Sequence, residues 1–384
     1  MLLKRFSKRF IRHPRSAWYA LLCYVFKVKS NKIVFSNFMG NGYGDNPKYI
    51  AEEILKKGLN YDIVWLVRQY YDNIPDAIRQ VKITSILGAY ELSTAKVIVI
   101  NSKGALPFFK KERQYMIQTW HSTYGPKYVE KDAMDILPSK YIKDSIENSQ
   151  ETDLFLSPCK LQTEEFRHAF WCECEVMPSG IPRNDIYFKE NGQLIEITRK
   201  KIGVPIDVNI LIYAPTLRDN KATDVYSSLN FEEIQDALEK KYGGKWYILI
   251  RLHPGIAYDV DLNINFNDSI INVSSYDDIQ EILLASSFLI TDYSSIMFDF
   301  YLLKKPVFLY TPDVDSPEIR GLRPMFNDFP FVHCKTQTEL LSAIDLFDMN
   351  RYLSEIDEFD KLFGSYDDGN ASEKVVERII KIMK

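Results

Sequence analysis

A histidine that follows an apolar run is the first candidate for chemistry in this sequence. His121 lies in Gln118-Thr-Trp-His-Ser-Thr-Tyr-Gly-Pro-Lys127, directly after the run that begins at Tyr115. The unperturbed pKa of an imidazole is about 6.5, which suits it to take up a proton near neutral pH. His121 is therefore a candidate general base, and the alternative is a structural histidine at the end of a strand. A second histidine, His253, occupies a comparable place in Arg251-Leu-His-Pro254.

Groups that bind anions follow four consecutive strands expected in the second half of the chain. Free backbone N–H groups at a helix N-terminus, helped by the macrodipole and by hydroxyls, bind phosphate oxygens without a metal. Arg218 would add a planar two-point contact to a diphosphate, and His253 would donate a hydrogen bond to a bridging or leaving oxygen. The predicted donor-side and phosphate-binding residues are Thr216, Arg218, Ser274, Ser275, Asp292, Ser294, Ser295 and Asp299.

Some of these residues also have a structural interpretation. Serine at such positions most often caps a helix, so Ser275 and Ser294 are candidate caps as well as phosphate ligands. Ser275 and Asp278 have the spacing of a capping box that would begin a helix at 279–285. Asp292 and Asp299 bring negative charge, which favours contacts to hydroxyl or N–H groups over contacts to phosphate.

A glycine-rich loop, Phe38–Lys48, follows the first expected strand. Its three glycines do not form the G-x-G-x-x-G pattern of dinucleotide sites. They would still let a substrate approach the backbone closely. The expected acceptor-side residues are Gly42, Asn46 and Lys48 in this loop, with Ser122 and Thr123 beside His121.

The elements that position these groups alternate between short β-rich runs and helical patterns from residue 32 onward, which is typical of βαβ units and parallel sheets. In such open sheets ligands bind beyond the carboxyl ends of the strands. The expected strands are 32–36, 62–67, 96–100, 115–119, 153–157, 209–213, 246–250, 270–273, 288–291 and 306–310. This pattern predicts an α/β fold of two Rossmann-like parallel-sheet domains that face a cleft.

The length of 384 residues also favours two domains. We expect a basic segment at 1–30, an acceptor domain at 31–188 and a donor domain at 194–384, with the last helix packing back on the first domain. Five scattered cysteines predict no disulfide framework and a reducing compartment. Cys172 and Cys174 lack the companion ligands of a zinc site, so we expect neither a metal nor another cofactor.

The beginning of the chain is strongly basic. Residues 1–44 contain nine Lys or Arg before the first acid, Asp45, which leaves 39 bases against 52 acids in the rest. Apolar Leu3, Phe6 and Phe10 recur at helical spacing opposite the basic residues, and the aromatic run that follows is too short to span a bilayer. The pattern favours a segment lying on an anionic membrane, with a basic helix packed on the protein's own surface as the alternative. No nucleic-acid partner is expected, and the oligomeric state is left open.

The motifs that carry these groups resemble the CDP-glycerol glycerophosphotransferases of teichoic acid synthesis, which include primases, polymerases and related capsule enzymes. The resemblance covers nearly the whole chain after the basic segment, and Trp-His-x-Thr together with Thr-Asp-Tyr-Ser-Ser is highly specific. The matching stretches are 45–50, 119–123, 180–185, 213–219, 251–254, 274–278, 290–299, 305–313 and 368–372.

The resemblance implies a GT-B fold, peripheral attachment to the cytoplasmic face of the cell membrane, and transfer of a polyol phosphate from a CDP-activated donor with release of CMP. The acceptor would be a lipid-linked or polymer hydroxyl, in cell-wall teichoic acid or capsule synthesis. The two important histidines of the family map onto His121 and His253. The sequence departs from the family at Ser122, where glycine is usual, and at Tyr124, where proline is common.

We therefore expect a phosphotransferase in which His121 takes the proton of the acceptor and His253 stabilises the phosphate or the departing CMP. The reverse assignment of the histidines stays open, as do the polyol, glycerol or ribitol, and the choice between primase and polymerase. The alternatives are a GT-B glycosyltransferase that uses a nucleotide sugar and a non-catalytic module that binds polymer at the membrane.

Overall fold

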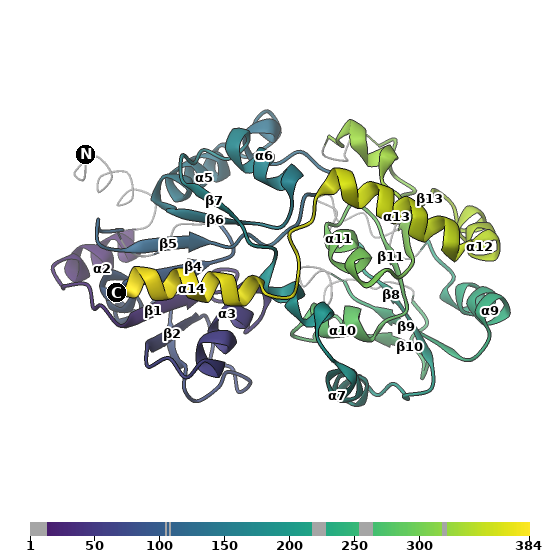
Figure 1. The fold of residues 1–384 in the computed structure, drawn as a ribbon, viewed down its shortest axis with the longest axis horizontal. Helices are drawn as coiled ribbons and strands as arrows, with labels where there is room; N and C mark the ends of the chain where they lie inside the picture. Colours follow the sequence, from purple (N-terminus) through teal and green to yellow (C-terminus); the bar gives the residue numbers. More distant parts are fainter. Residues whose placement is uncertain (1–13, 104–105, 107–108, 217–227, 253–263, 317–320) are drawn as a thin grey trace. The chain divides into compact units, whose positions relative to one another are not determined.

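A computed structural model describes residues 14–103, 106, 109–216, 228–252, 264–316 and 321–384 (Figure 1). The chain forms two compact units. Unit 1 contains the chain up to His121, Val129–Asp185 and Ser365–Lys384, and unit 2 contains Ser122–Tyr128 and Ile186–Gly364. The short segment Ser122–Tyr128, which begins directly after His121, is thus part of unit 2 and not of the domain 31–188 expected from the sequence.

Unit 1 is built on a parallel sheet of seven strands in the order β3-β2-β1-β4-β5-β6-β7. Its strands are β1 (Lys32–Ser36), β2 (Asp62–Val67), β3 (Arg79–Lys82), β4 (Val97–Ile100), β5 (Tyr115–Gln118), β6 (Leu154–Ser157) and β7 (Glu175–Pro178). The central strands are continuous apolar runs because helices cover both faces of the sheet. Side chains alternate accordingly, so Ile33 and Phe35 enter one core while Val34 enters the other.

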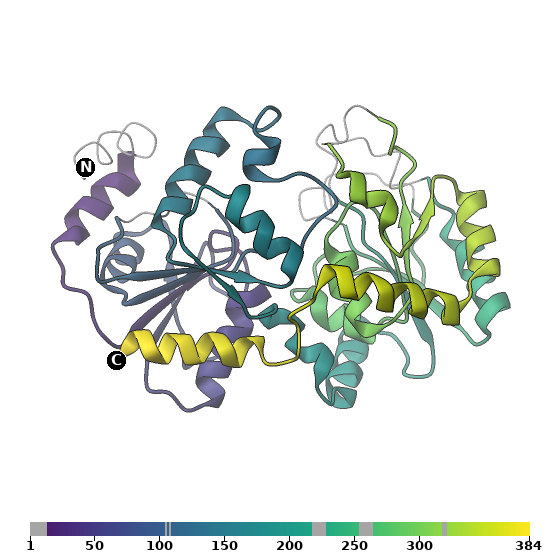
Figure 2. The ribbon, with the colours of Figure 1, turned by 45° about the horizontal axis from the view of Figure 1, so that its top comes forward.

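Helices complete unit 1 on both faces. They are α2 (Pro14–Tyr24), α3 (Asp45–Lys56), α4 (Ile86–Thr94), η1 (Glu130–Ala133), α5 (Ser139–Glu151), α6 (Lys160–His168), η2 (Pro182–Phe188) and the C-terminal α14 (Ala371–Met383). Helix α14 packs beside α3 in the same core as Ile33, and both views show it lying along the sheet (Figures 1 and 2). Its own side chains Val375, Val376 and Ile379 are fully buried.

Unit 2 is a parallel sheet of six strands in the order β10-β9-β8-β11-β12-β13. The strands are β8 (Asn209–Tyr213), β9 (Trp246–Ile250), β10 (Ile270–Asn272), β11 (Phe288–Thr291), β12 (Val307–Tyr310) and β13 (Val332–Cys334). The helices are α7 (Gly192–Ile202), α9 (Phe231–Tyr242), α10 (Ile279–Ala285), α11 (Ile296–Phe300), η3 (Tyr301–Leu303), η4 (Pro324–Asp328), α12 (Gln337–Leu346) and α13 (Met349–Phe363).

The prediction of two Rossmann-like parallel sheets is confirmed, and all ten expected strands form. Strands β3, β7 and β13 were missed because they are short sheet edges of mixed polarity, whose sequence carries little periodic signal. One cysteine prediction needs correction. The structure joins Cys172 and Cys174 by a disulfide, because these residues are only two apart in the chain and their Cα atoms lie 5.3 Å from each other. Cys23, Cys159 and Cys334 are free and buried.

Candidate active site

In unit 1 the loops that follow β1 and β4 diverge at the point where the strand order reverses, the usual place of a ligand site in an open α/β sheet. Two asparagines connect these loops. The Asn101 side-chain amide, which follows β4, donates to Oδ1 of Asn37 at 2.7 Å, and its Oδ1 accepts from the backbone N–H of Phe38 at 2.8 Å. The two loops are therefore fixed to each other beside the exit of β5.

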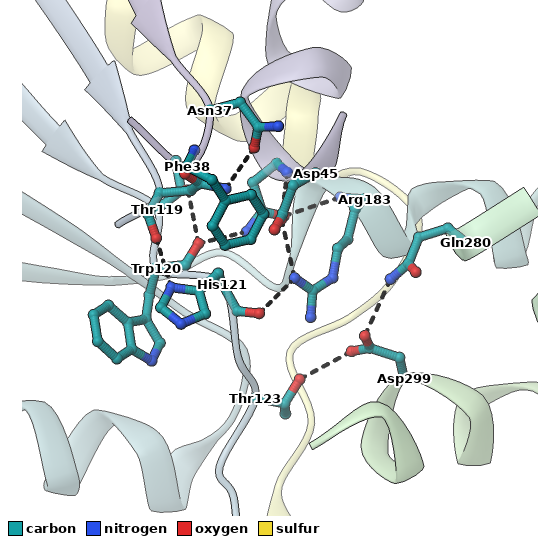
Figure 3. Close-up of polar contacts among 12 residues, drawn as sticks. Asn37, Phe38, Asp45, Thr119, Trp120, His121, Thr123, Arg183, Gln280 and Asp299 are labelled. Atoms are coloured by element: carbon teal, nitrogen blue, oxygen red, sulfur yellow. Dashed lines mark hydrogen bonds and ion pairs between the residues drawn. The ribbon is translucent and has the colours of Figure 1, made fainter. Parts of the chain in front are cut away.

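His121 follows β5 and is half-buried next to these loops (Figure 3). Its Nδ1 lies 2.8 Å from the backbone oxygen of Asn101. A carbonyl oxygen can only accept, so Nδ1 carries the proton and the Nε2 lone pair is left to act as a base. The ring contacts Trp120 at 4.4 Å and the edge of Phe38 at 5.4 Å between centroids.

Burial lowers the pKa of His121 below the ordinary 6.5. The hydrogen bond to Asn101 and the carboxylate of Asp45 act in the opposite direction, and Arg183 adds to the lowering. The net direction keeps the imidazole neutral near pH 7, which is the form that can take up a proton.

The backbone at His121 is held in an unusual conformation. Trp120 has a φ of 56°, in the left-handed region that a bulky side chain rarely adopts. Two side chains stabilise it, and a third, Asp45, holds one of them in place. The Asn46 amide donates to the Trp120 oxygen at 3.0 Å, and Nη1 of Arg183 donates to the His121 oxygen at 2.8 Å and to Asp45 at 3.0 Å. Asn46, predicted on the acceptor side, thus holds the backbone beside His121.

The stretch 180–185 forms a clasp with the C-terminal part of unit 1. Gly180 has a φ of 80° and lies so close to the backbone that an added Cβ would be 3.0 Å from Cα of Asp367. The N–H of Ile181 donates to Asp367 at 2.8 Å, and the Asp185 carboxylate accepts from two N–H groups at the start of α14. This clasp fixes the turn that carries Arg183.

Unit 2 has a corresponding pair of loops after β8 and β11. Asp292 accepts from both the N–H and the hydroxyl of Thr216 at 2.9–3.0 Å. This agrees with the expectation that Asp292 contacts hydroxyl and N–H groups. Thr216 follows β8 and Asp292 follows β11, so their hydrogen bonds join the two loops at the place where the strand order of unit 2 reverses.

Asp299 anchors the segment Ser122–Tyr128 within unit 2. Its Oδ1 accepts from the buried hydroxyl of Thr123 at 3.0 Å, and its Oδ2 accepts from Gln280 at 3.1 Å. Arg323 holds the same segment, because its Nε donates to the Gly125 oxygen at 3.0 Å and its guanidinium lies 4.5 Å from the Tyr124 ring centroid. Thr123, predicted on the acceptor side, and Asp299, predicted on the donor side, are hydrogen-bonded partners.

The predicted serines differ in their surroundings. Ser274 accepts from the N–H of Leu252 at 2.9 Å and so fixes the exit of β9. The predicted capping box is wrong: Asp278 alone caps α10, since a turn at Val273–Tyr276 keeps Ser275 outside the helix.

Ser295 occupies the N-cap of the five-residue α11 without a side-chain cap bond. Ser294 accepts only a long contact, 3.4 Å, from the second N–H beyond it.

The remaining predicted residues are spread out. Gly42, with a φ of 73°, accepts from the Trp65 indole through its carbonyl, and Lys48 lies in α3 with its ammonium 5.1 Å from the Tyr49 ring centroid. Ser122 is half-buried. His253 and Arg218 lie outside the described residues. Within the described ranges, no three His, Cys, Asp or Glu side chains gather in a way that would hold a metal ion.

The family model described as CDP-Glycerol:Poly(glycerophosphate) glycerophosphotransferase matches residues 18–381. The chain belongs to this family. A teichoic acid poly(glycerol phosphate) polymerase of Staphylococcus epidermidis is 33% identical over 372 residues, which are 93% of this chain and 51% of that protein. A teichoic acid glycerol-phosphate transferase of Staphylococcus aureus is 30% identical and is covered completely, with 99% of this chain aligned. The chain thus spans about half the length of the first relative and the full length of the second.

Solved structures give the same family. The wall teichoic acid polymerase TagF superposes with a TM-score of 0.85 at 32% identity, covering 99% of this chain and 97% of that chain. The predicted GT-B class of two Rossmann-like domains is confirmed by this likeness. In the part of this chain that the structure describes, no helix has both the length and the apolar character needed to span a bilayer.

Proposed function

We propose that the protein transfers a polyol phosphate, glycerol phosphate or ribitol phosphate, from a CDP-activated donor to a hydroxyl of a lipid-linked or polymer acceptor. CMP is the other product, and the polymer is a teichoic acid or a capsular polymer. The observation that carries the proposal is His121, held with Nδ1 on a carbonyl and Nε2 available as a base. Family membership supplies the reaction class. Relatives include glycerol-phosphate and ribitol-phosphate polymerases, and a TagF variant was solved after soaking with CDPG.

In this mechanism Nε2 of His121 takes the proton of the acceptor hydroxyl while the oxygen of that hydroxyl attacks the β-phosphorus of the CDP-polyol. The new P–O bond forms as the bond from that phosphorus to the bridging oxygen breaks, and the electron pair leaves with CMP. The diphosphate would be bound by Ser274, Ser275, Ser294, Ser295 and Arg218, and His253 would donate to the departing phosphate. Phosphoryl transfer needs mainly position and charge stabilisation, so we propose that no resident metal or other cofactor takes part.

A donor panel tests the proposed reaction. The protein is incubated with CDP-glycerol, CDP-ribitol or UDP-sugars and a lipid-linked or polymer acceptor, and the release of CMP or UDP is measured. Acceptor-dependent CMP release supports the proposal. Acceptor-dependent UDP release without CMP would instead identify a glycosyltransferase, and the absence of turnover with every donor would favour a binding module.

The role of His121 has a matched control in the same unit. His168 is an exposed histidine of α6 whose ring pairs with Asp132 at 2.9 Å. We expect His121→Gln to lower CMP release by a factor of roughly 10² to 10⁴, the usual contribution of a general base, while His168→Gln retains it. Full activity in His121→Gln would refute the assignment.

We also propose that unit 1 rests on an anionic membrane surface at the cytoplasmic face. Helices α2 and α4 pack against each other, and each keeps apolar side chains exposed, including Leu22 at 52% and Ile86 at 52%. Trp18, Val25, Phe26 and Leu87 extend the exposed apolar set. Apolar burial combined with the basic residues that flank α2 suits a surface of anionic lipid.

Vesicle sedimentation tests the membrane contact. The variant Leu22→Ser/Ile86→Ser should lose binding to vesicles that contain phosphatidylglycerol, and Leu346→Ser in unit 2, also exposed at 79%, should not. Equal binding by all three proteins would show that α2 and α4 do not form the contact. Raising the salt concentration should weaken the binding of the unmodified protein, because part of the attraction is between charges.

A further inference from the structure

Asn101 is the first residue after β4 and has no solvent exposure. It makes three hydrogen bonds to three different partners. Its side chain binds Asn37 and the backbone N–H of Phe38, and its own carbonyl accepts from His121. One residue thereby connects the exits of three neighbouring strands, β1, β4 and β5.

The loop on the β1 side of this connection needs such support. Phe38 and Met39 have φ values of 38° and 58°, two consecutive non-glycine residues in the left-handed region. Such conformations persist when the surroundings hold them in place. The bond from the Phe38 N–H to Asn101 is one such restraint, and it also holds the Phe38 ring against His121.

We propose that Asn101 is a positioning residue that holds His121 with its proton on Nδ1 and its Nε2 directed to the acceptor. This inference rests on the proposed function only for its effect on turnover. The geometric part, the tautomer of the imidazole, holds or fails whether or not His121 is the base.

The charged groups around His121 are paired with each other. Asp45 of α3 binds Arg183 of η2 at 3.0 Å, and Glu130 of η1 binds Lys103 at 2.9 Å. Both pairs are largely buried. A carboxylate introduced at position 101 would therefore be an additional negative charge next to the imidazole. It would raise the pKa of His121.

The tautomer is measured directly by long-range ¹H–¹⁵N correlation on the full-length protein labelled at histidine, with His121→Gln used to assign the signal. The unmodified protein should show the Nδ1–H form near pH 7.5. Asn101→Ala keeps the backbone oxygen that accepts from His121 but removes the side-chain bonds to Asn37 and Phe38 that fix that oxygen in place. The His121 signal should therefore move toward the average of the two neutral tautomers. An unchanged Nδ1–H signal in Asn101→Ala would overturn the proposal.

Kinetics add a second, independent readout. Asn101→Ala should lower kcat for CMP release by a factor of roughly 10 to 100 with little change in the KM of the CDP-polyol, because the proposed donor-binding residues belong to unit 2. Asn101→Asp should move the acidic limb of the kcat/KM profile upward by about one pH unit. An Asn101→Asp profile that coincides with that of the unmodified protein would contradict the positioning role.

Asn41→Ala is the matched control, since Asn41 lies in the same loop and its side chain donates to the Phe38 oxygen at 2.7 Å, whereas the Asn101 side chain accepts from the Phe38 N–H. It should keep both the tautomer and the pH profile. If Asn41→Ala reproduced the tautomer change, general loosening of the loop would explain the result and the specific role of Asn101 would fail. If His121→Gln stayed active while Asn101→Ala altered the tautomer, the positioning role of Asn101 would be supported and the role of His121 as the base would be refuted.

Discussion

Replacing Gly180 by alanine tests how tightly the clasp of unit 1 is packed. The residue has a φ of 80°, so any L side chain there is strained. Its Cβ would lie 3.0 Å from both the Asp367 Cα and the Tyr366 oxygen. These are backbone atoms that cannot rotate away.

The expected cost has two parts. The left-handed conformation costs an alanine about 1–2 kcal/mol relative to glycine. Forcing the two backbone segments apart adds about 1–3 kcal/mol, the usual penalty for overpacking. We therefore expect Gly180→Ala to lower the free energy of unfolding of unit 1 by about 2–5 kcal/mol.

Gly58→Ala isolates the first part of this cost. Gly58 belongs to unit 1 and has a φ of 62°, but an added Cβ would meet nothing within 4 Å. It should cost only about 1–2 kcal/mol. Urea unfolding can be followed by tryptophan fluorescence, since four of the five tryptophans, all except Trp246, lie in unit 1. Equal losses in the two variants would refute the close approach between 180 and 366–367.

Three further predictions concern protonation and single hydrogen bonds. Because burial lowers the pKa of His121 below 6.5, kcat/KM should be constant above that pH and fall only at lower pH; a limb centred above pH 6.5 would contradict the prediction. Asp185→Ala removes the acceptor of two N–H groups at the start of α14 and should cost about 1–3 kcal/mol in urea unfolding, with α14 amides exchanging faster. Thr123→Val should destabilise unit 2 by about 1–3 kcal/mol, since buried Asp299 loses a donor, whereas Thr123→Ser should remain close to the unmodified protein in a thermal melt.

Much of the fold follows from local sequence. The strands at the centres of both sheets are short, continuous apolar runs, and burial on both faces requires that composition. The edge strands β3 and β7 were missed because their residues, Arg79–Lys82 and Glu175–Pro178, are partly exposed and polar. Their pairing depends on a neighbouring strand and not on their own pattern.

The site was predictable only where residue type alone suggests chemistry. His121, Asn46 and Asp292 were identified from their place after a strand or within a loop. Asn101 and Arg183 were not, although both bind the His121 segment directly. Arg183 had one signal in the sequence, its place in the motif at 180–185, and that motif indicates the family but not the contact with His121.

The sequence by itself determined the two parallel sheets, the family and the histidine that follows β5. Apolar runs and glycine-containing motifs are local features, and burial of such runs is favourable in any arrangement that covers them. The tertiary structure decided which nitrogen of His121 carries the proton. That choice depends on the backbone oxygen of Asn101, 20 residues away, and the backbone of His121 is held by Arg183, 62 residues away. Hydrogen bonds are directional and short-ranged, so only the folded chain brings such partners to bonding distance.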